Sequence, residues 1–351
     1  MYPKSLFSVN FQKFLDNVFF SYVWRVSKRN VRYLLKRLPA RLRRMEMEEV
    51  RSVAEYIECL KGYQRSGLCG YRPEVRYYYR GESRDYGATS GQAMIGRGNW
   101  LEGRNEAKLF RECERRLTDE FLDCKSTFEK LVMMQHYGIP TRILDISLDP
   151  LVALFFALYL DARGRKDDSD DGIVLVYEVP ENSIKNYHSD AVSVVSNLAV
   201  YSHYDDLDVE KICRAHGKER KEFNKDDAVQ HLLHEIKAEK PYFLDWINPD
   251  DLSSVFCVHP LLTNPRIKAQ QGAFLLFGLK GDQHHLATLE SSKQKEKIRM
   301  RKVRIPHSAK ENIRGELQLL ARTVDVIYPD WDGVSDYFAR FYGKTADKFY
   351  K

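Results

Sequence analysis

The stretch MQHYGIPTRILDISLDPLVALFFAL, residues 134–158, joins a polar turn and a short strand pattern to the most apolar run of the chain. Asp149 followed by Pro150 predicts a helix start, because the aspartate can cap a backbone N–H and proline has no N–H to leave unpaired there. Residues 151–160 are apolar on every side, which predicts a buried helix. A strand over 141–147 that leads directly into this helix predicts that the core is built around the stretch.

Strand and helix patterns elsewhere predict an α+β fold with a mixed β-sheet core and flanking helices. Residues 302–306 are typical of an edge strand, because their basic side chains and terminal proline suit an unpaired edge. The other strand patterns cover residues 75–83, 172–179, 253–261 and 273–279, and helix patterns cover residues 45–63, 105–128 and 309–322. Five glycines in residues 86–103 predict a loop.

Charge divides the chain into a basic helical N-terminal extension, 1–48, and a main domain, 49–351, in which 183–250 is predicted to be an insertion. Nine Lys or Arg and no acidic residue lie between Arg25 and Arg44. Apolar residues recur there at helical spacing, so one interpretation is an amphipathic helix on the body with its basic faces in solvent. The other is a surface that binds nucleic acid or an acidic protein partner.

Composition excludes several classes of protein. With 351 residues, 43% of them hydrophobic, the chain can bury a large core. No apolar run approaches the roughly 20 residues of a membrane-spanning helix. The six cysteines lack the spacing of a disulfide framework or a zinc finger, which favours a reducing compartment. We therefore predict a cytoplasmic protein that is not bound to a membrane and has no metal site.

Polar residues beside the core stretch are the candidates for a functional site. Asp145 on the predicted strand requires a partner if it is buried, and Arg80 at the end of strand 75–83 can form a structural ion pair with Asp145 or with Glu82. Arg80 could instead bind phosphate or ribose oxygens, since its guanidinium is planar and permanently charged. His136 either stabilises the turn or acts as a general acid or base. Arg142 is expected to hold the fold by ion pairing.

Three separated motifs resemble the FRG domain, a family of bacterial and phage proteins named for an aromatic-Arg-Gly motif. The motifs are Tyr79-Arg80-Gly81, then residues 135–145, then Asn264-Pro265-Arg266-Ile267 with Gln270, Gly272 and Phe274. Residues 327–333 resemble the closing motif of the family. The family is in turn distantly similar to the ADP-ribosyltransferase fold, so the resemblance implies a fold of that type for residues 50–340.

The resemblance also implies a chemistry, in which NAD is the substrate and no metal takes part. The implied cofactor-binding residues are Tyr79, Arg80, Gly81, Thr141 and Ser147, and the implied catalytic residues are His136, Asp145 and Gln270. The chain has Gln270-Gln271 where the best-known transferases carry a glutamate, so Asp145 is expected to supply the carboxylate. The function implied is an NAD-dependent ADP-ribosyltransferase acting as a bacterial toxin or phage-defence effector. The alternative is a non-catalytic module that binds a nucleotide or RNA.

Overall fold

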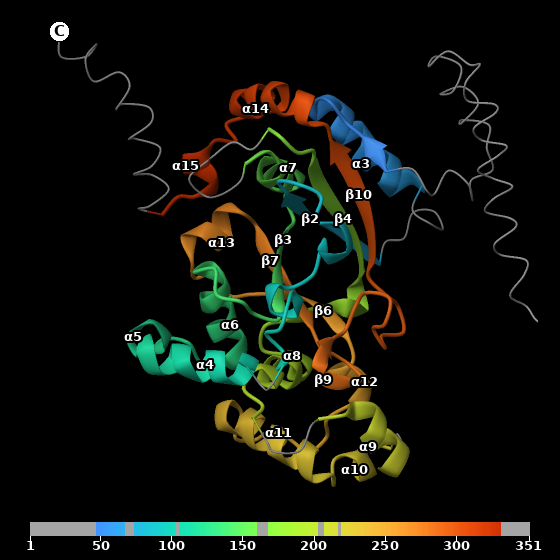
Figure 1. Ribbon diagram of the computed structural model, residues 1–351, viewed down its shortest axis with the longest axis vertical. Coiled ribbons are helices and arrows are strands. Elements are labelled where there is room, and N and C mark those ends of the chain that lie inside the picture. The colour runs from blue at the N-terminus through green and yellow to red at the C-terminus, as the bar shows by residue number, and fades with distance from the viewer. Residues whose placement is uncertain are drawn as a thin grey trace, which may run out of the picture. The chain divides into compact units, whose positions relative to one another are not determined.

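A computed structural model describes residues 47–66, 74–102, 105–159, 168–202, 207–216 and 219–330. Its central feature is an eight-stranded sheet with the strand order β1-β10-β4-β2-β3-β7-β6-β5 (Figure 1). The N-terminal extension predicted over 1–48 lies outside the described residues apart from its last two, and so do the last three residues of the closing motif, 331–333.

The sheet is mixed, as the sequence predicts. The outermost pairs, β1 with β10 and β5 with β6, are parallel, and the other neighbours are antiparallel. The strands are β1 (Glu48–Glu49), β2 (Val75–Glu82), β3 (Ile143–Ser147), β4 (Gly172–Pro180), β5 (Ile184–Asn186), β6 (Val255–His259), β7 (Gly272–Phe277) and β10 (Arg299–Ile305). A separate hairpin is formed by β8 (Leu279–Lys280) and β9 (Asp282–Leu286).

Three helices cover one face of the sheet at its β10-β4-β2 end: α3 (Val53–Ser66), α7 (Pro150–Leu158) and α14 (Lys310–Leu319). The α7 helix is the predicted apolar helix, and it begins as expected, because Asp149 Oδ1 accepts a hydrogen bond from the N–H of Leu151 at 2.8 Å. Its side chains pack against alternate residues of β2 and β4, such as Tyr79 and Val176. This cluster is the first half of the core.

A second group of helices covers the β3-β7-β6 end of the sheet: α6 (Thr127–His136), α8 (Asp190–Ser196) and α11 (Asp227–Glu239). They pack on residues such as Ile143 and Leu276. Tyr79 of β2 lies opposite Ser147 of β3, and Ile143 is on the same face as Ser147 because side chains alternate along a strand. Both groups of helices therefore cover the same face of the sheet, and Asp145 lies on that face between them.

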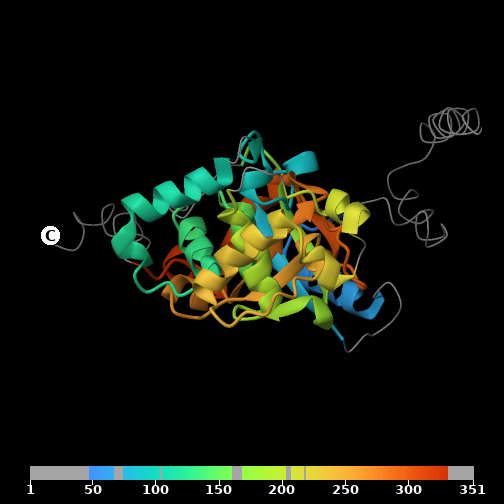
Figure 2. The same cartoon turned by 90° about the horizontal axis from the view of Figure 1, so that it is seen from below.

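The opposite face is covered by loops. Ala93 from the loop after β2 packs there, as do Ala287 and Ile298 from the segment between β9 and β10, against Tyr177 and Leu275 of the sheet. The remaining helices are α4 (Asn105–Arg116), α5 (Thr118–Phe121), α9 (Val209–His216), α10 (Arg220–Phe223), α12 (Pro249–Leu252), α13 (Pro265–Ala269) and α15 (Val324–Ile327) (Figure 2). The segment predicted as an insertion, 183–250, begins with β5 and α8, so its first residues belong to the sheet and the core.

Three predicted elements differ from the structure. The helix expected over 45–63 begins only at Val53, because residues 48 and 49 pair with β10. Consequently β10, which contains most of the strand predicted at the edge over 302–306, is not the edge strand, because β1 lies outside it. The helix expected over 105–128 is interrupted, and α6 starts anew where Ser126 Oγ accepts from the N–H of Glu129. In the described part of the chain no helix is long and apolar enough to cross a membrane.

The sheet opens between β2 and β3. These two strands pair at one position, Tyr79 with Ser147, whereas β2 pairs with β4 at eight positions and β3 with β7 at five. Beyond that single pair, Arg80 and Glu82 on β2 have no strand partner on the β3 side. The opening lies in the centre of the sheet, between the strands that carry Arg80 and Asp145.

Candidate functional site

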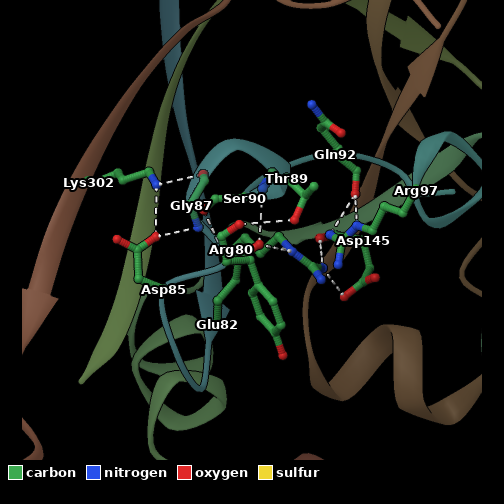
Figure 3. A network of polar contacts seen from close by, with 12 residues as sticks. Arg80, Glu82, Asp85, Gly87, Thr89, Ser90, Gln92, Arg97, Asp145 and Lys302 are labelled. Carbon is green, nitrogen blue, oxygen red and sulfur yellow. Dashed lines mark hydrogen bonds and ion pairs between the residues drawn. The ribbon is translucent and has the colours of Figure 1, made fainter. Parts of the chain in front are cut away.

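Arg80 fills the opening between β2 and β3. Its Nη1 lies 2.7 Å from Oδ2 of Asp145 and also donates to the backbone carbonyl of Asp145 at 2.9 Å (Figure 3). The guanidinium therefore takes the place of the strand pairing that β2 and β3 do not make here. The structure pairs the two residues that the sequence offered both as a structural ion pair and as parts of a site.

Glu82 is a second carboxylate beside Arg80. Its Oε1 lies 3.6 Å from Nε of Arg80, and its side chain is 1% exposed. The two carboxylate oxygens also accept hydrogen bonds from Ser90 Oγ at 2.5 Å and from the N–H of Gly91 at 3.0 Å. Glu82 thus ties the loop after β2 to the strand, and Arg80 lies between a carboxylate that holds this loop and one that faces solvent.

The Asp145 carboxylate is ionised and accessible at the same time. Burial raises its pKa, but the charge of Arg80 and a hydrogen bond from Gln135 outweigh burial, and the pKa of Asp145 falls below its usual value. For Arg80, burial lowers the pKa, and the charges of Asp145 and Glu82 more than reverse this effect. The Asp145 side chain is nevertheless 53% exposed, so a ligand can contact its negative charge.

A hydrogen-bonded relay orients Asp145 from the side of α6. Thr141 Oγ1 donates to Oε1 of Gln135 at 2.7 Å, which directs the Gln135 Nε2 to donate to Asp145 Oδ1 at 3.0 Å. Thr141 is buried, with 1% of its surface exposed. Thr141 therefore acts on Asp145 only through Gln135. Gln135 is a site residue that lies within the motif 135–145, but the sequence alone did not identify it as one.

Arg266 supplies a second positive charge. It lies on α13, whose start is capped by Asn264 Oδ1 accepting from the Arg266 N–H at 2.8 Å. Its guanidinium is 4.5 Å from the centre of the Tyr328 ring, and its charge lowers the pKa of Asp145. The sequence motif Asn-Pro-Arg-Ile contains this arginine, and only the folded chain brings it close to β3.

His136 at the end of α6 is held in its neutral form. Burial is the largest cause, and the charge of Arg266 adds to it, so the pKa of His136 falls below its ordinary value even though Asp330 opposes the change. A neutral imidazole at pH 7 can accept a proton. Since His136 directly follows Gln135 in the chain, its backbone lies next to the residue that contacts Asp145.

Two of the implied cofactor-binding residues have packing roles in the structure. A Cβ on Gly81 would lie 1.9 Å from the carbonyl oxygen of Ala153 and 2.6 Å from the nitrogen of Ala157. This glycine therefore allows α7 to approach β2 closely. Tyr79, the residue two positions before it, is buried under α7 in the same core cluster.

Ser147 and Gln270 form a junction beside the opening. Ser147 Oγ donates to the carbonyl of Gln270 at 2.7 Å and accepts from the N–H of Asp149 at 2.9 Å. The Gln270 side chain donates from Nε2 to the carbonyl of Ile327 at 3.1 Å. These bonds join β3, α7, α13 and α15, and they direct the Gln270 amide to α15.

Two buried donors in the opening have no hydrogen-bond partner among the described residues, Nε of Arg80 and the hydroxyl of Tyr177. Tyr177 on β4 is completely buried, and its electrostatic neighbours are Arg80, Glu82 and Asp145. Buried polar groups in proteins nearly always have a partner. Both atoms are buried, and Arg80 Nε faces the Glu82 carboxylate at 3.6 Å, so neither atom is open to a ligand. The described residues contain no group of three or more His, Cys, Asp or Glu placed to hold a metal ion.

Comparison with known proteins gives one result. The model of the FRG domain family matches residues 75–166. No curated protein and no solved structure matches the chain. The matched segment begins with β2 and includes β3 and α7, so it contains both Arg80 and Asp145 and the opening between their strands. The motifs and this match identify an FRG domain within the chain, over residues 75–166.

Proposed function

We propose that the protein is an NAD-dependent ADP-ribosyltransferase, with its active site in the opening between β2 and β3. The observation that carries the proposal is the Asp145 carboxylate, which is ionised, half exposed and placed between Arg80 and Gln135. A fixed negative charge of this kind stabilises a transition state in which positive charge develops on a ribose ring. Arg266 supplies positive charge for the pyrophosphate of NAD.

In the proposed reaction, ADP-ribose passes from nicotinamide to an acceptor. The bond between the ribose C1′ and the nicotinamide nitrogen breaks, and nicotinamide leaves as a neutral molecule with the bonding electron pair. Asp145 stabilises the oxocarbenium character at C1′. An oxygen or nitrogen atom of the acceptor forms the new bond to C1′, and its proton passes to neutral His136 acting as a general base.

A likeness to the ADP-ribosyltransferase fold is part of this proposal. Its support is the order of three parts along the chain. An arginine on β2 comes first, then β3, which leads into the apolar helix α7, and then Gln270, which lies directly before β7. The proposed biological role, as a bacterial toxin or phage-defence effector in the cytoplasm, rests on the character of the family. Fold-level similarity supports such a role by analogy.

A second candidate function is a module that binds a nucleotide without cleaving it. The Gln270 amide is bonded to Ile327 of α15. Of the two carboxylates that pair with Arg80 in the described residues, Glu82 is buried and Asp145 faces solvent. Arg80 is already engaged by Asp145, so bound phosphate would have to compete for it. RNA is the alternative ligand, through the predicted basic extension that lies outside the described residues.

Incubation of the purified protein with NAD separates these functions, with free nicotinamide measured by chromatography. We expect nicotinamide release by the protein and a loss of roughly 100-fold or more in Asp145→Asn, the size of effect seen when one transition-state contact is removed. The control is Asp171→Asn, which breaks a similar pair with Arg304 of β10, on the side of β4 away from β3, and should retain the activity. NAD that binds to the wild-type protein but stays intact would identify the module instead.

A further inference from the structure

A groove of about 910 Å³ runs along α6 next to the candidate site. One wall is formed by α5 and the residues that follow it, and the other by the loop before α13 and by α13 itself. In Figure 1 the α6 helix lies between α5 and α13. The groove is large enough for several side chains of a peptide, and ligand sites in proteins commonly have volumes of roughly 300–1,000 Å³.

The floor of the groove is apolar and fixed in place. It includes Val132 and Met133 of α6, Tyr187, and Ile267 of α13. Each of these side chains is partly buried and packs on the core beneath, so the floor does not collapse when the groove is empty. Partly exposed apolar side chains in a concave surface favour a ligand with apolar groups of its own.

The rim of the groove is negative. Asp119, Glu120 and Asp123 are exposed, and within the described residues none of them is in an ion pair. Five carboxylates line the groove against two lysines, and one of these, Lys240, is already paired with Asp190 at 3.1 Å. The whole chain has a net charge of +6, so this negative rim departs from the overall charge.

Glu239 adds a carboxylate oxygen that needs a donor. Its Oε2 accepts from the N–H of Thr127 at 2.7 Å, whereas Oε1 is buried and has no hydrogen-bond partner among the described residues. A buried carboxylate oxygen without a donor is unfavourable. An ammonium or guanidinium group of a ligand would satisfy it, which agrees with the charge of the rim.

The groove also leads to the candidate site. His136 lines it, and the preceding residue, Gln135, donates to Asp145 at 3.0 Å. Asn264 and Ile267 line it as well, on either side of Arg266, whose charge acts on both His136 and Asp145. A ligand that follows the groove would therefore end beside the opening between β2 and β3.

We propose that this groove binds a segment of the acceptor protein that has a basic face and an apolar face. The apolar side chains rest on Val132, Met133 and Ile267, and the basic ones face the carboxylates of the rim. The role of the bound protein as the acceptor rests on the proposed transferase function, whereas its binding to the groove does not require NAD. A nucleic acid does not fit here, because phosphate groups would meet the carboxylates.

The probe for a direct test is a fluorescein-labelled peptide of leucine and lysine, about 14 residues long, with the leucines at helical spacing. Binding to the full chain is followed by fluorescence anisotropy. The test variant combines Asp119→Asn, Glu120→Gln and Asp123→Asn. The control variant combines Glu74→Gln, Asp170→Asn and Glu219→Gln, which removes the same charge at exposed positions outside the groove.

We expect a Kd about tenfold higher for the test variant and a change of less than about twofold for the control, since three rim charges act together. Met133→Ser should also raise the Kd about tenfold, through the loss of apolar contact. Equal affinity in the two charge variants would overturn the proposal, and so would competition between the peptide and an oligouridine for the groove.

The two proposals fail in different ways. Peptide binding that depends on the rim, in a protein that leaves NAD intact, supports the groove and rejects the transferase function. Nicotinamide release without any binding of the peptide supports the transferase function and rejects the groove. If both hold, the peptide should become ADP-ribosylated by the wild-type protein and much less by the test variant, as read by mass spectrometry.

Discussion

Two arginines in this protein are bound in the same way, yet their surroundings differ. Arg142 donates to Glu106 and to the carbonyl of Phe277, and Arg80 donates to Asp145 and to the carbonyl of the same residue. The first pair is closed, with side-chain exposures of 1% and 10%. The second is open on one side, with 18% for Arg80 and 53% for Asp145.

The difference separates a pair that holds the fold from one that offers a charge to a ligand. A closed pair contributes mainly by avoiding an unpaired buried charge. An open pair is screened by water and contributes little to stability, and its exposed carboxylate can contact a ligand.

The largest effect is expected for the closed pair. Glu106→Ala leaves the guanidinium of Arg142 buried without its carboxylate, and this should lower the free energy of unfolding by about 3–5 kcal/mol. Glu112→Ala on the same helix, α4, is the control, because Glu112 pairs with Arg115 and Arg116 at the surface and its loss should change the stability far less. Urea denaturation measures both. A similar loss in the two variants would show that the closed pair is no more important than a surface pair.

The next effect concerns the strand that carries Arg80. Gly81→Ala places a Cβ against backbone atoms of α7, so the helix must shift, at a cost of about 1–3 kcal/mol. Gly62→Ala in α3 is the control. A Cβ there meets no atom within 4 Å, and the change should stabilise the helix by roughly 0.5–1 kcal/mol. Thermal unfolding should therefore shift in opposite directions for the two variants, and equal shifts would contradict the close approach of α7 to β2.

The sequence was sufficient to predict those elements whose signals lie in neighbouring residues. The run 134–158 predicted β3 and α7, and both are confirmed, because alternation, an Asp-Pro helix start and an apolar run are properties of neighbouring residues. The ion pair of Arg142 was expected, but its partner could not be named, since Glu106 is 36 positions away.

The candidate site was predicted less completely, for the same physical reason. Gly81 was implied to bind the cofactor, and the structure shows in addition that it lets α7 approach β2 closely, which only packing reveals. The Gln270 amide bonds to Ile327, 57 positions away. Arg266 and Gln135 lay within the quoted motifs, but their effect on Asp145 depends on the distance between α6, α13 and β3 in the folded chain.

A smaller effect is expected when the open pair is titrated with acid. The pKa of Asp145 is lowered in the folded state, so its contribution to stability is fully present above the unfolded value of about 3.9. The contribution is lost as the pH falls through the lower, folded value. The difference in unfolding free energy between the wild type and Asp145→Asn should be constant from pH 7 to about 5, at no more than about 1 kcal/mol, and should vanish in stronger acid. A difference that already disappears near neutral pH would mean that Arg80 does not hold Asp145 ionised.

The smallest effect is a change in the titration of His136, and it shows whether Arg266 belongs to the same electrostatic unit as the open pair. Because burial and the charge of Arg266 both lower the pKa of His136, Arg266→Gln should raise it toward the ordinary value of about 6.5. Arg322→Gln, which removes an arginine paired with Asp149, is the matched control and should leave the His136 resonance unchanged in an NMR titration. If His136 is the general base, the acid limb of nicotinamide release moves to higher pH in Arg266→Gln by the same amount as the NMR value. A shift of the resonance without a shift of the rate would place His136 in the groove alone and leave the proton of the acceptor to another group.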